Sequence, residues 1–204
     1  MKKFVAALAV VPLVFSLAAC GSSSNGNGDS KKITIGVVGN ETANQVLKDE
    51  AAKQGITIEY SEFTDYAQPN PAVDAGDNDM NRFQHIAYLA NYNVSSGKDL
   101  QIVGSTNIYP MAIFSKKHKK VDEIPQGGTI AIPNDSVNEA RALLLLKAQN
   151  LVTFKSEVHT PTHNDIDTGK SKVKVTPVDA AQTVVSLDSV DAAVINNTSL
   201  RMRA

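Results

Sequence analysis

Residues 33–60, ITIGVVGNETANQVLKDEAAKQGITIEY, decide the fold of this chain. Apolar residues alternate from Ile33 to Val37, as in a half-buried strand, and then recur at helical spacing from Ala43 to Ala51. Gly55 follows as a residue suited to end a helix, and a second strand is expected from Ile56 to Tyr60. Strand–helix–strand units of this kind favour a parallel sheet, with ligand sites at the carboxyl ends of the strands.

The second half of the chain repeats this alternation. We expect strands at 129–133, 173–175 and 192–195, and helices at 136–151 and 179–187. Between the two halves, residues 100–115 alternate only weakly and contain a glycine and a proline. This stretch is a candidate for the crossing between two lobes of an α/β protein.

The first twenty residues are typical of a bacterial lipoprotein export signal. A basic start is followed by an almost wholly apolar stretch, and Leu17-Ala18-Ala19 places small residues ahead of Cys20, the only cysteine. The apolar stretch is shorter than the roughly 20 residues of a membrane-spanning helix and is interrupted by Pro12. We therefore expect removal of residues 1–19, lipidation of Cys20 and a flexible polar tether over residues 20–30.

Composition excludes several other classes of protein. The net charge of -1, without a basic stripe, gives no reason to expect a nucleic-acid partner. With Cys20 taken by lipid, no disulfide and no cysteine-based metal site is expected. The four histidines lack metal-ligand spacing, and no cofactor is predicted; they are His85, His118, His159 and His163.

The most specific candidate site is Ile132-Pro133-Asn134-Asp135-Ser136-Val137-Asn138-Glu139-Ala140-Arg141. Ser136 and Glu139 have capping-box spacing, which predicts the start of the helix. Asn138 and Arg141 then lie three residues apart on one face of its first turn. A helix start beside a guanidinium can hold a carboxylate through two parallel hydrogen bonds. The alternative is that Arg141 is a solvated helix residue and Asn138 only a turn residue.

An aromatic group is the second candidate. Tyr66, Phe83, His85 and Tyr88 are dense for a chain with only 5% Phe, Trp and Tyr. Such rings can line a cleft that grips an apolar or thioether side chain. Taken alone, they fit an ordinary core better than a ligand pocket.

A third candidate is the end of the strand at 192–195. Asn196 places a neutral amide, with both donors and an acceptor, where the carboxyl end of a strand meets a cleft. Such a group suits a zwitterion, although Asn196-Asn197 is also ordinary turn chemistry.

Taken together, these segments resemble a known family. Asp65-Tyr66-Ala67-Gln68-Pro69-Asn70, Asn81-Arg82-Phe83-Gln84-His85, Ala131 to Asp135 with Asn138 and Arg141, and Ala193-Val194-Ile195-Asn196 follow one another in family order. From about Ile33 to Thr198 the chain resembles the NlpA/MetQ methionine-binding lipoproteins, the substrate-binding components of methionine ABC importers.

The resemblance implies a two-lobed α/β fold of the type II periplasmic-binding-protein class. It implies a lipid-anchored protein on the extracytoplasmic face of the cell membrane, which captures L- or D-methionine for a permease and an ATPase. Arg141 would take the ligand carboxylate with Asn138 nearby, Asn196 would hold the head group, and Tyr66, Phe83, His85 and Tyr88 would line the side-chain pocket. Lobe 1 is expected at 31–112, lobe 2 at 113–197 and a short tail at 198–204.

Departures from the family pattern leave other functions open. Family members continue for several dozen residues beyond the strand that ends at Asn196, so we expect lobe 1 to lack part of its sheet. A truncated lipoprotein with weak or no ligand binding is therefore an alternative. An enzyme is a second one, with Ser136 or Ser115 as nucleophile and His85 as base, but no Gly-x-Ser-x-Gly motif supports it.

Overall fold

The structure is a computed structural model that describes residues 31–39 and 42–196. The predicted signal segment 1–19, the predicted lipidation site Cys20, the tether 20–30 and the tail 198–204 lie outside the described residues. The elements run in chain order β1 Lys31–Val38, α1 Thr42–Ala52, β2 Ile56–Phe63, α2 Pro69–Asp74, β3 Met80–Arg82, α3 Ile86–Ser96, β4 Met111–Phe114, η1 Val121–Glu123, β5 Thr129–Pro133, α4 Ser136–Ala148, η2 His163–Asp165, β6 Lys174–Val178, η3 Ala180–Gln182, α5 Thr183–Ser186 and β7 Ala192–Asn196.

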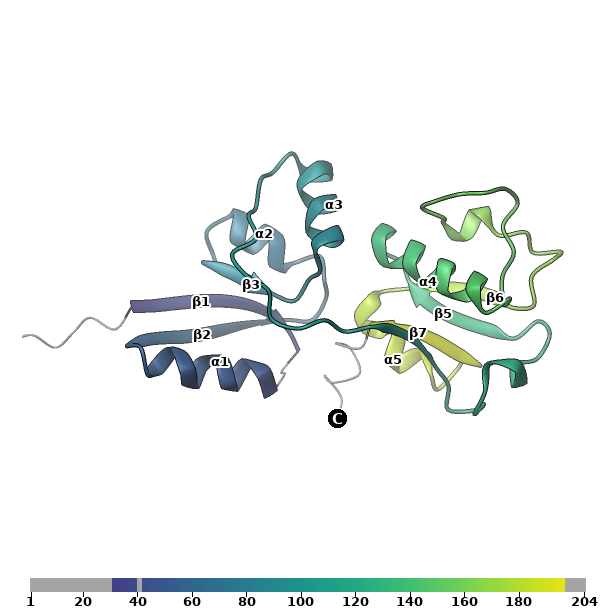
Figure 1. Cartoon of the computed structure of the whole chain (residues 1–204), viewed down its shortest axis with the longest axis horizontal. Helices are drawn as coiled ribbons and strands as arrows, with labels where there is room; N and C mark the ends of the chain where they lie inside the picture. The colour runs from purple at the N-terminus through teal and green to yellow at the C-terminus, as the bar shows by residue number, and fades with distance from the viewer. Residues whose placement is uncertain (1–30, 40–41, 197–204) are drawn as a thin grey trace, which may run out of the picture.

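The first lobe is a parallel sheet in the order β2-β1-β3. Helix α1 covers one face of the sheet, while α2 and α3 lie on the other side (Figure 1). The predicted strand–helix–strand opening is confirmed as β1, α1 and β2, and Gly55 has the positive φ of 72° that suits a residue just after a helix. Ile35, Val37 and Ile58 are buried between the sheet and α1 and form the core of this lobe.

The second lobe is a mixed sheet in the order β4-β7-β5-β6. Strand β5 runs parallel to both β6 and β7, and β4 pairs antiparallel with β7. Its largest core cluster lies between the sheet and α4 and includes Ile130, Ile132, Leu143 and Leu146, all with no exposed surface. The predicted strands at 129–133 and 192–195 are confirmed as β5 and β7, and the strand predicted at 173–175 is β6, which extends to Val178. Helix α4 ends at Ala148, three residues before the predicted end, and the helix predicted at 179–187 is the 3-10 turn η3 followed by the short helix α5.

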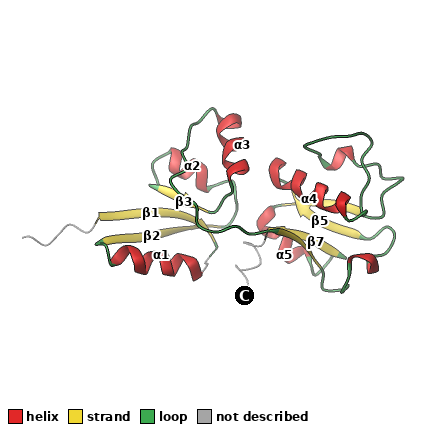
Figure 2. Ribbon diagram, viewed as in Figure 1, coloured by secondary structure: helices red, strands yellow, loops and turns green. Residues whose placement is uncertain are grey.

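The lobes are joined by a loop between α3 and β4, which crosses from one sheet to the other (Figure 2). The predicted crossing at 100–115 corresponds to this loop, together with β4, which already belongs to the second sheet. Helices α3 and α4 face one another across the junction (Figure 1). One buried cluster joins Val38 and Tyr66 of the first lobe to Ala180 of the second, so the lobes are packed together at this point.

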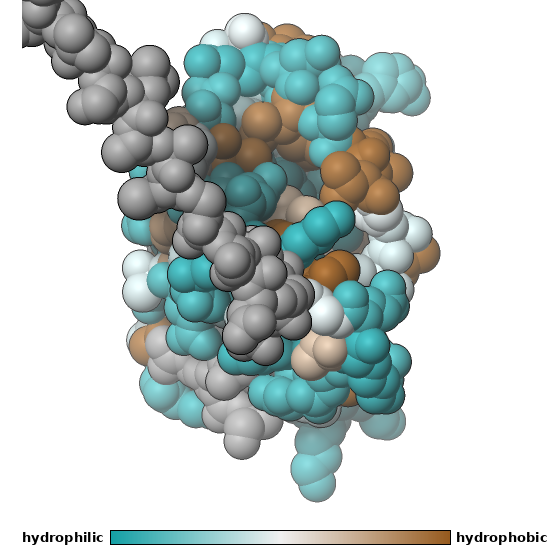
Figure 3. Space-filling view, turned by 90° about the vertical axis from the view of Figure 1, so that its left-hand side faces the viewer, coloured by the Kyte–Doolittle hydropathy of each residue, from teal (hydrophilic) through white to brown (hydrophobic). Residues whose placement is uncertain are grey.

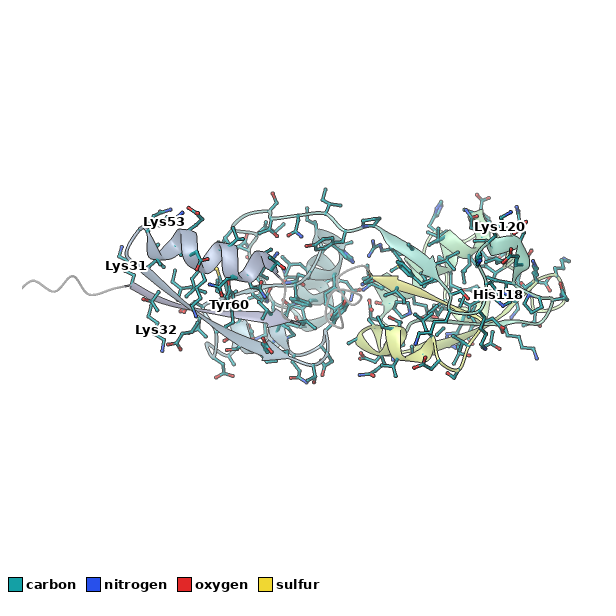
Figure 4. The ribbon with its side chains drawn as sticks, turned by 90° about the horizontal axis from the view of Figure 1, so that it is seen from below. Lys31, Lys32, Lys53, Tyr60, His118 and Lys120 are labelled. Carbon is teal, nitrogen blue, oxygen red and sulfur yellow. The ribbon has the colours of Figure 1, made fainter. Side chains whose placement is uncertain are left out.

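The outer surfaces are mixed in character. Apolar side chains appear among hydrophilic ones at the end of the molecule formed by the first lobe (Figure 3), and Ile86 and Val94 on α3 are 71% and 87% exposed. His118 and Lys120 lie on the second lobe, far from the first-lobe residues Tyr60 and Lys53 (Figure 4).

Among the helices of the described segments, none combines the length and the apolar character needed to cross a bilayer.

Candidate functional site

The start of α4 lies at the junction of the lobes and carries the two residues with the most specific prediction. Helix α4 begins at Ser136 as expected, but the predicted capping box of Ser136 and Glu139 is wrong. The N-cap is Asp135, whose Oδ1 accepts a hydrogen bond from the Asn138 backbone N–H at 2.9 Å. The Glu139 carboxylate instead accepts a hydrogen bond from the backbone N–H of His163 at 2.8 Å. This tertiary contact with the segment before β6 replaces the local bond that a capping box requires.

Asn138 is the centre of the polar network at this helix start. Its side chain is buried, with 1% exposure. Its Oδ1 accepts from Arg141 Nη1 at 2.7 Å and lies 3.1 Å from His85 Nε2 of the first lobe. Its Nδ2 donates to Asp135 Oδ2 at 3.0 Å. The predicted neighbouring placement of Asn138 and Arg141 on one helix face is thus present, and the same amide also links the two lobes.

Arg141 is a partly buried cation without a carboxylate partner among the described residues. Its Nη1 is held by the Asn138 amide oxygen, while both oxygens of Asp135 accept from Asn138. Burial lowers the pKa of the Arg141 guanidinium, an effect opposed by the nearby charge of Asp135. Because a desolvated guanidinium is costly until an anion pairs with it, this group is prepared to accept a carboxylate through its remaining N–H donors.

His85 has one tautomer that satisfies both ring nitrogens. Nδ1 accepts from the Tyr88 backbone N–H at 3.2 Å and caps α3, so Nε2 carries the proton and donates to Asn138 Oδ1. The His85 pKa is lowered, mainly by burial, with a smaller contribution in the same direction from the Arg141 charge. The neutral ring therefore bridges the lobes, while its other nitrogen fixes the start of α3.

The four predicted pocket residues gather into one cluster. Ring centroids lie 5.9 Å apart for Tyr66 and Phe83, 5.7 Å for Phe83 and Tyr88, and 6.2 Å for His85 and Tyr88. The last two pairs are edge-to-face, a favoured arrangement for aromatic rings. The Tyr88 hydroxyl donates to the Tyr66 carbonyl oxygen at 3.0 Å, and burial raises the pKa of that hydroxyl to about 12. Tyr88 therefore stays neutral and contributes an apolar ring surface.

A pocket opens beside this cluster and reaches both lobes. Its lining includes Tyr66, Asn70 and Tyr88 from the first lobe and Asp135 from the second. Phe83, His85 and Arg141 are not part of its lining. Tyr66 and Tyr88 thus line a cleft, whereas Phe83 and His85 do not contribute to it. The core interpretation and the pocket interpretation of the aromatic group each describe some of its rings.

Asn196 lies at the carboxyl end of β7, the strand next to β5 in the sheet. Because these two strands are parallel, Asn196 shares an edge of the sheet with the loop that leads into α4. Its Oδ1 is buried and has no hydrogen-bond partner within the described part of the chain. Buried acceptors are rarely left unpaired, so this oxygen is a candidate for a ligand donor such as an ammonium group.

Comparison with known proteins identifies the family. Residues 33–203 match the family model described as NlpA lipoprotein. The chain belongs to the NlpA lipoprotein family. The fold and the ordered motifs of this NlpA-family chain therefore agree with the resemblance inferred from sequence.

Named relatives are similar over most of the chain. "Outer membrane lipoprotein 1" of Mannheimia haemolytica is 43% identical over 82% of this chain and 62% of the relative, so the chain spans less than two thirds of that protein. The "Probable D-methionine-binding lipoprotein MetQ" of Vibrio cholerae is 38% identical over 96% of this chain and 73% of the relative. A nutrient-binding protein from Burkholderia cenocepacia, solved bound to methionine, superposes with a TM-score of 0.75 at 39% identity, over 82% of this chain and 72% of that one. These similarities confirm the prediction that this NlpA-family chain has a two-lobed α/β fold.

No hydrogen bond between His85 and Ser115 or Ser136 is present among the described residues. His85 directs its two ring nitrogens to Tyr88 and Asn138, whereas the Ser115 hydroxyl donates to the Asp191 carbonyl oxygen in the second lobe. Ser136 is exposed at the start of α4. Within 31–39 and 42–196, no group of three or more His, Cys, Asp or Glu side chains is arranged to hold a metal ion.

Two parts of the site were not singled out from sequence. Asp135 caps α4 and holds Asn138; helix starts favour aspartate, but they favour the neighbouring Ser136 about equally. Ala180 of the second lobe packs in one cluster with Tyr66 of the first, and no local sequence pattern predicts that contact.

Proposed function

We propose that this protein captures free methionine between its two lobes and delivers it to an ABC importer. The observation that carries the proposal is the partly buried Arg141, which lacks a carboxylate partner among the described residues and is oriented by Asn138. The aromatic cluster of the first lobe stands across the junction, joined to Asn138 through His85. A charged site for a carboxylate thus lies beside rings suited to an apolar side chain.

Each part of methionine has a proposed partner. The carboxylate would pair with Arg141 through charge-assisted hydrogen bonds while Asn138 holds the guanidinium in place. The ammonium group would donate to the unpaired Oδ1 of Asn196. The thioether would lie against Tyr66, Phe83, His85 and Tyr88, where a sulfur–ring contact contributes roughly 0.3–1.5 kcal/mol.

The relatives support the choice of ligand and of transport role. One similar protein is named as D-methionine-binding, another was solved with methionine, and a third is the substrate-binding protein of a methionine transporter from Streptococcus pneumoniae. We propose that lobes at 31–112 and 113–197 close on the ligand and that permease and ATPase subunits receive it. We also propose that acyl chains on Cys20 hold the protein at the extracytoplasmic face of the membrane.

Calorimetry tests this proposal. The purified protein is titrated with L-methionine, D-methionine, norleucine, alanine and glutamate, and circular dichroism checks that it is folded. Saturable heat for at least one methionine enantiomer, with weaker binding of alanine and glutamate, is the expected result. A folded protein that gives no heat with either enantiomer contradicts the proposal, and ester hydrolysis abolished by Ser136→Ala would favour the enzyme instead.

A further inference from the structure

Three side-chain amides form a closed cluster beside the aromatic rings. Asn70 Nδ2 donates to Gln84 Oε1 at 2.9 Å, and Gln84 Nε2 donates back to Asn70 Oδ1 at 2.6 Å. Asn81 Nδ2 donates to the same Asn70 oxygen at 2.8 Å, and Gln84 Nε2 also contacts Asn81 Oδ1 at 3.1 Å. Each of the three amides is therefore bonded to both of the others.

The cluster is buried where an unpaired amide would be costly. Asn70 is 1% exposed, and Asn81 and Gln84 are partly buried. All three amide oxygens and all three amide nitrogens have partners within the cluster, and Asn81 Nδ2 also reaches the Pro69 carbonyl oxygen at 3.3 Å. Loss of Asn70 or Gln84 would leave an amide group of another member without its partner, so the cluster has one preferred arrangement.

The three amides come from the segments that carry the pocket rings. Asn70 lies at the start of α2, directly after the turn that holds Tyr66, in which Asp65 Oδ1 accepts from the Ala67 N–H at 2.8 Å. Gln84 lies between Phe83 and His85 in the turn from β3 to α3. The reciprocal Asn70–Gln84 pair thus ties together the two turns that face one another in the ring cluster.

We propose that Asn70, Asn81 and Gln84 are positioning residues that fix the distance between the Tyr66 turn and the Phe83–His85 turn. Through this spacing the cluster sets the width of the side-chain pocket and the reach of His85 to Asn138 across the lobes. The predicted change in ligand affinity rests on the proposed function. The predicted change at His85 does not, because it is measured in the protein without ligand.

Gln84→Met is the direct test, because methionine keeps the length and volume of glutamine while removing its amide. The ring of His85 should lose its fixed place, and its pKa, followed by NMR in the ligand-free protein, should rise toward its ordinary value. Affinity for methionine should fall roughly tenfold, whereas affinity for alanine, whose side chain is too short to reach the rings, should stay nearly unchanged.

Gln54→Met is the matched control, since Gln54 is exposed just after α1 and remote from the cluster. It should alter neither the His85 titration nor the ratio of methionine to alanine affinity. If Gln84→Met does not fold, Asn81→Ala provides a milder change, because the reciprocal Asn70–Gln84 pair is left intact. The same shifts, smaller in size, are then expected.

The outcomes separate the two proposals. A folded Gln84→Met or Asn81→Ala protein whose His85 titrates as in the parent overturns the positioning role. If the parent protein fails to bind methionine but the His85 pKa still rises in Gln84→Met, the positioning role is supported and the proposed function is contradicted. An equal loss of affinity for methionine and alanine, with no change at His85, would indicate general destabilisation and also overturns the proposal.

Discussion

Replacing Arg141 by alanine is expected to abolish most of the affinity for methionine. The guanidinium is partly buried and held by Asn138 at 2.7 Å, so its remaining donors are directed without a large ordering cost at binding. A hydrogen bond to a charged group contributes about 1.5–3 kcal/mol, and two of them would be lost. Losing both would cost about 3–6 kcal/mol, which corresponds to a dissociation constant roughly 10² to 10⁴ times higher.

The assay compares three variants by calorimetry at low and moderate salt. Arg141→Lys keeps the charge but loses the planar fork and should fall between the parent protein and Arg141→Ala. Lys147→Ala is the control, since Lys147 lies in the last turn of the same helix and packs its ammonium over Phe154. Affinity within threefold of the parent value for Arg141→Ala would refute the assignment, and so would an equal loss for Lys147→Ala.

Three further predictions concern the network around Asn138 and the core behind it. The His85 pKa is lowered in the fold and is about 6.5 in the unfolded chain, so the stabilising contribution of neutral His85 is complete above about pH 6.5. This contribution is lost as the pH falls from about 6.5 toward the lowered pKa. Between pH 8 and 5, the melting temperature of His85→Gln should therefore depend less steeply on pH than that of the parent protein. Asp135→Ala removes the cap of α4 and should lower the free energy of unfolding in urea by about 0.5–2 kcal/mol, whereas an unchanged midpoint would contradict the capping role. Leu143→Ala leaves a cavity behind the fully buried side chain and should cost about 2–5 kcal/mol by the same assay, so a loss below 1 kcal/mol would show that the core is looser than described.

The strand and helix pattern could be predicted because it depends on local spacing. Alternation from Ile33 to Val37 and the helical recurrence that follows are confirmed as β1 and α1. The same holds for the neighbouring placement of Asn138 and Arg141, since residues three apart on a helix share a face. These predictions needed no knowledge of what packs against each element.

The details that failed depend on tertiary contacts. Asp135 and Ser136 are both good N-cap residues, and sequence alone could not show which one would cap α4. Glu139 has the spacing of a capping box, but its carboxylate binds the backbone N–H of His163, which lies 24 residues further along the chain. The contact between His85 and Asn138 spans 53 positions and exists only because the two lobes meet.

The most direct test of a methionine site at the start of α4 is a crystal structure of the protein grown with methionine. The account predicts the ligand between the lobes, with its carboxylate within hydrogen-bond distance of the Arg141 guanidinium and its ammonium group at Asn196 Oδ1. A ligand bound elsewhere, with Arg141 directed into bulk solvent, would contradict it.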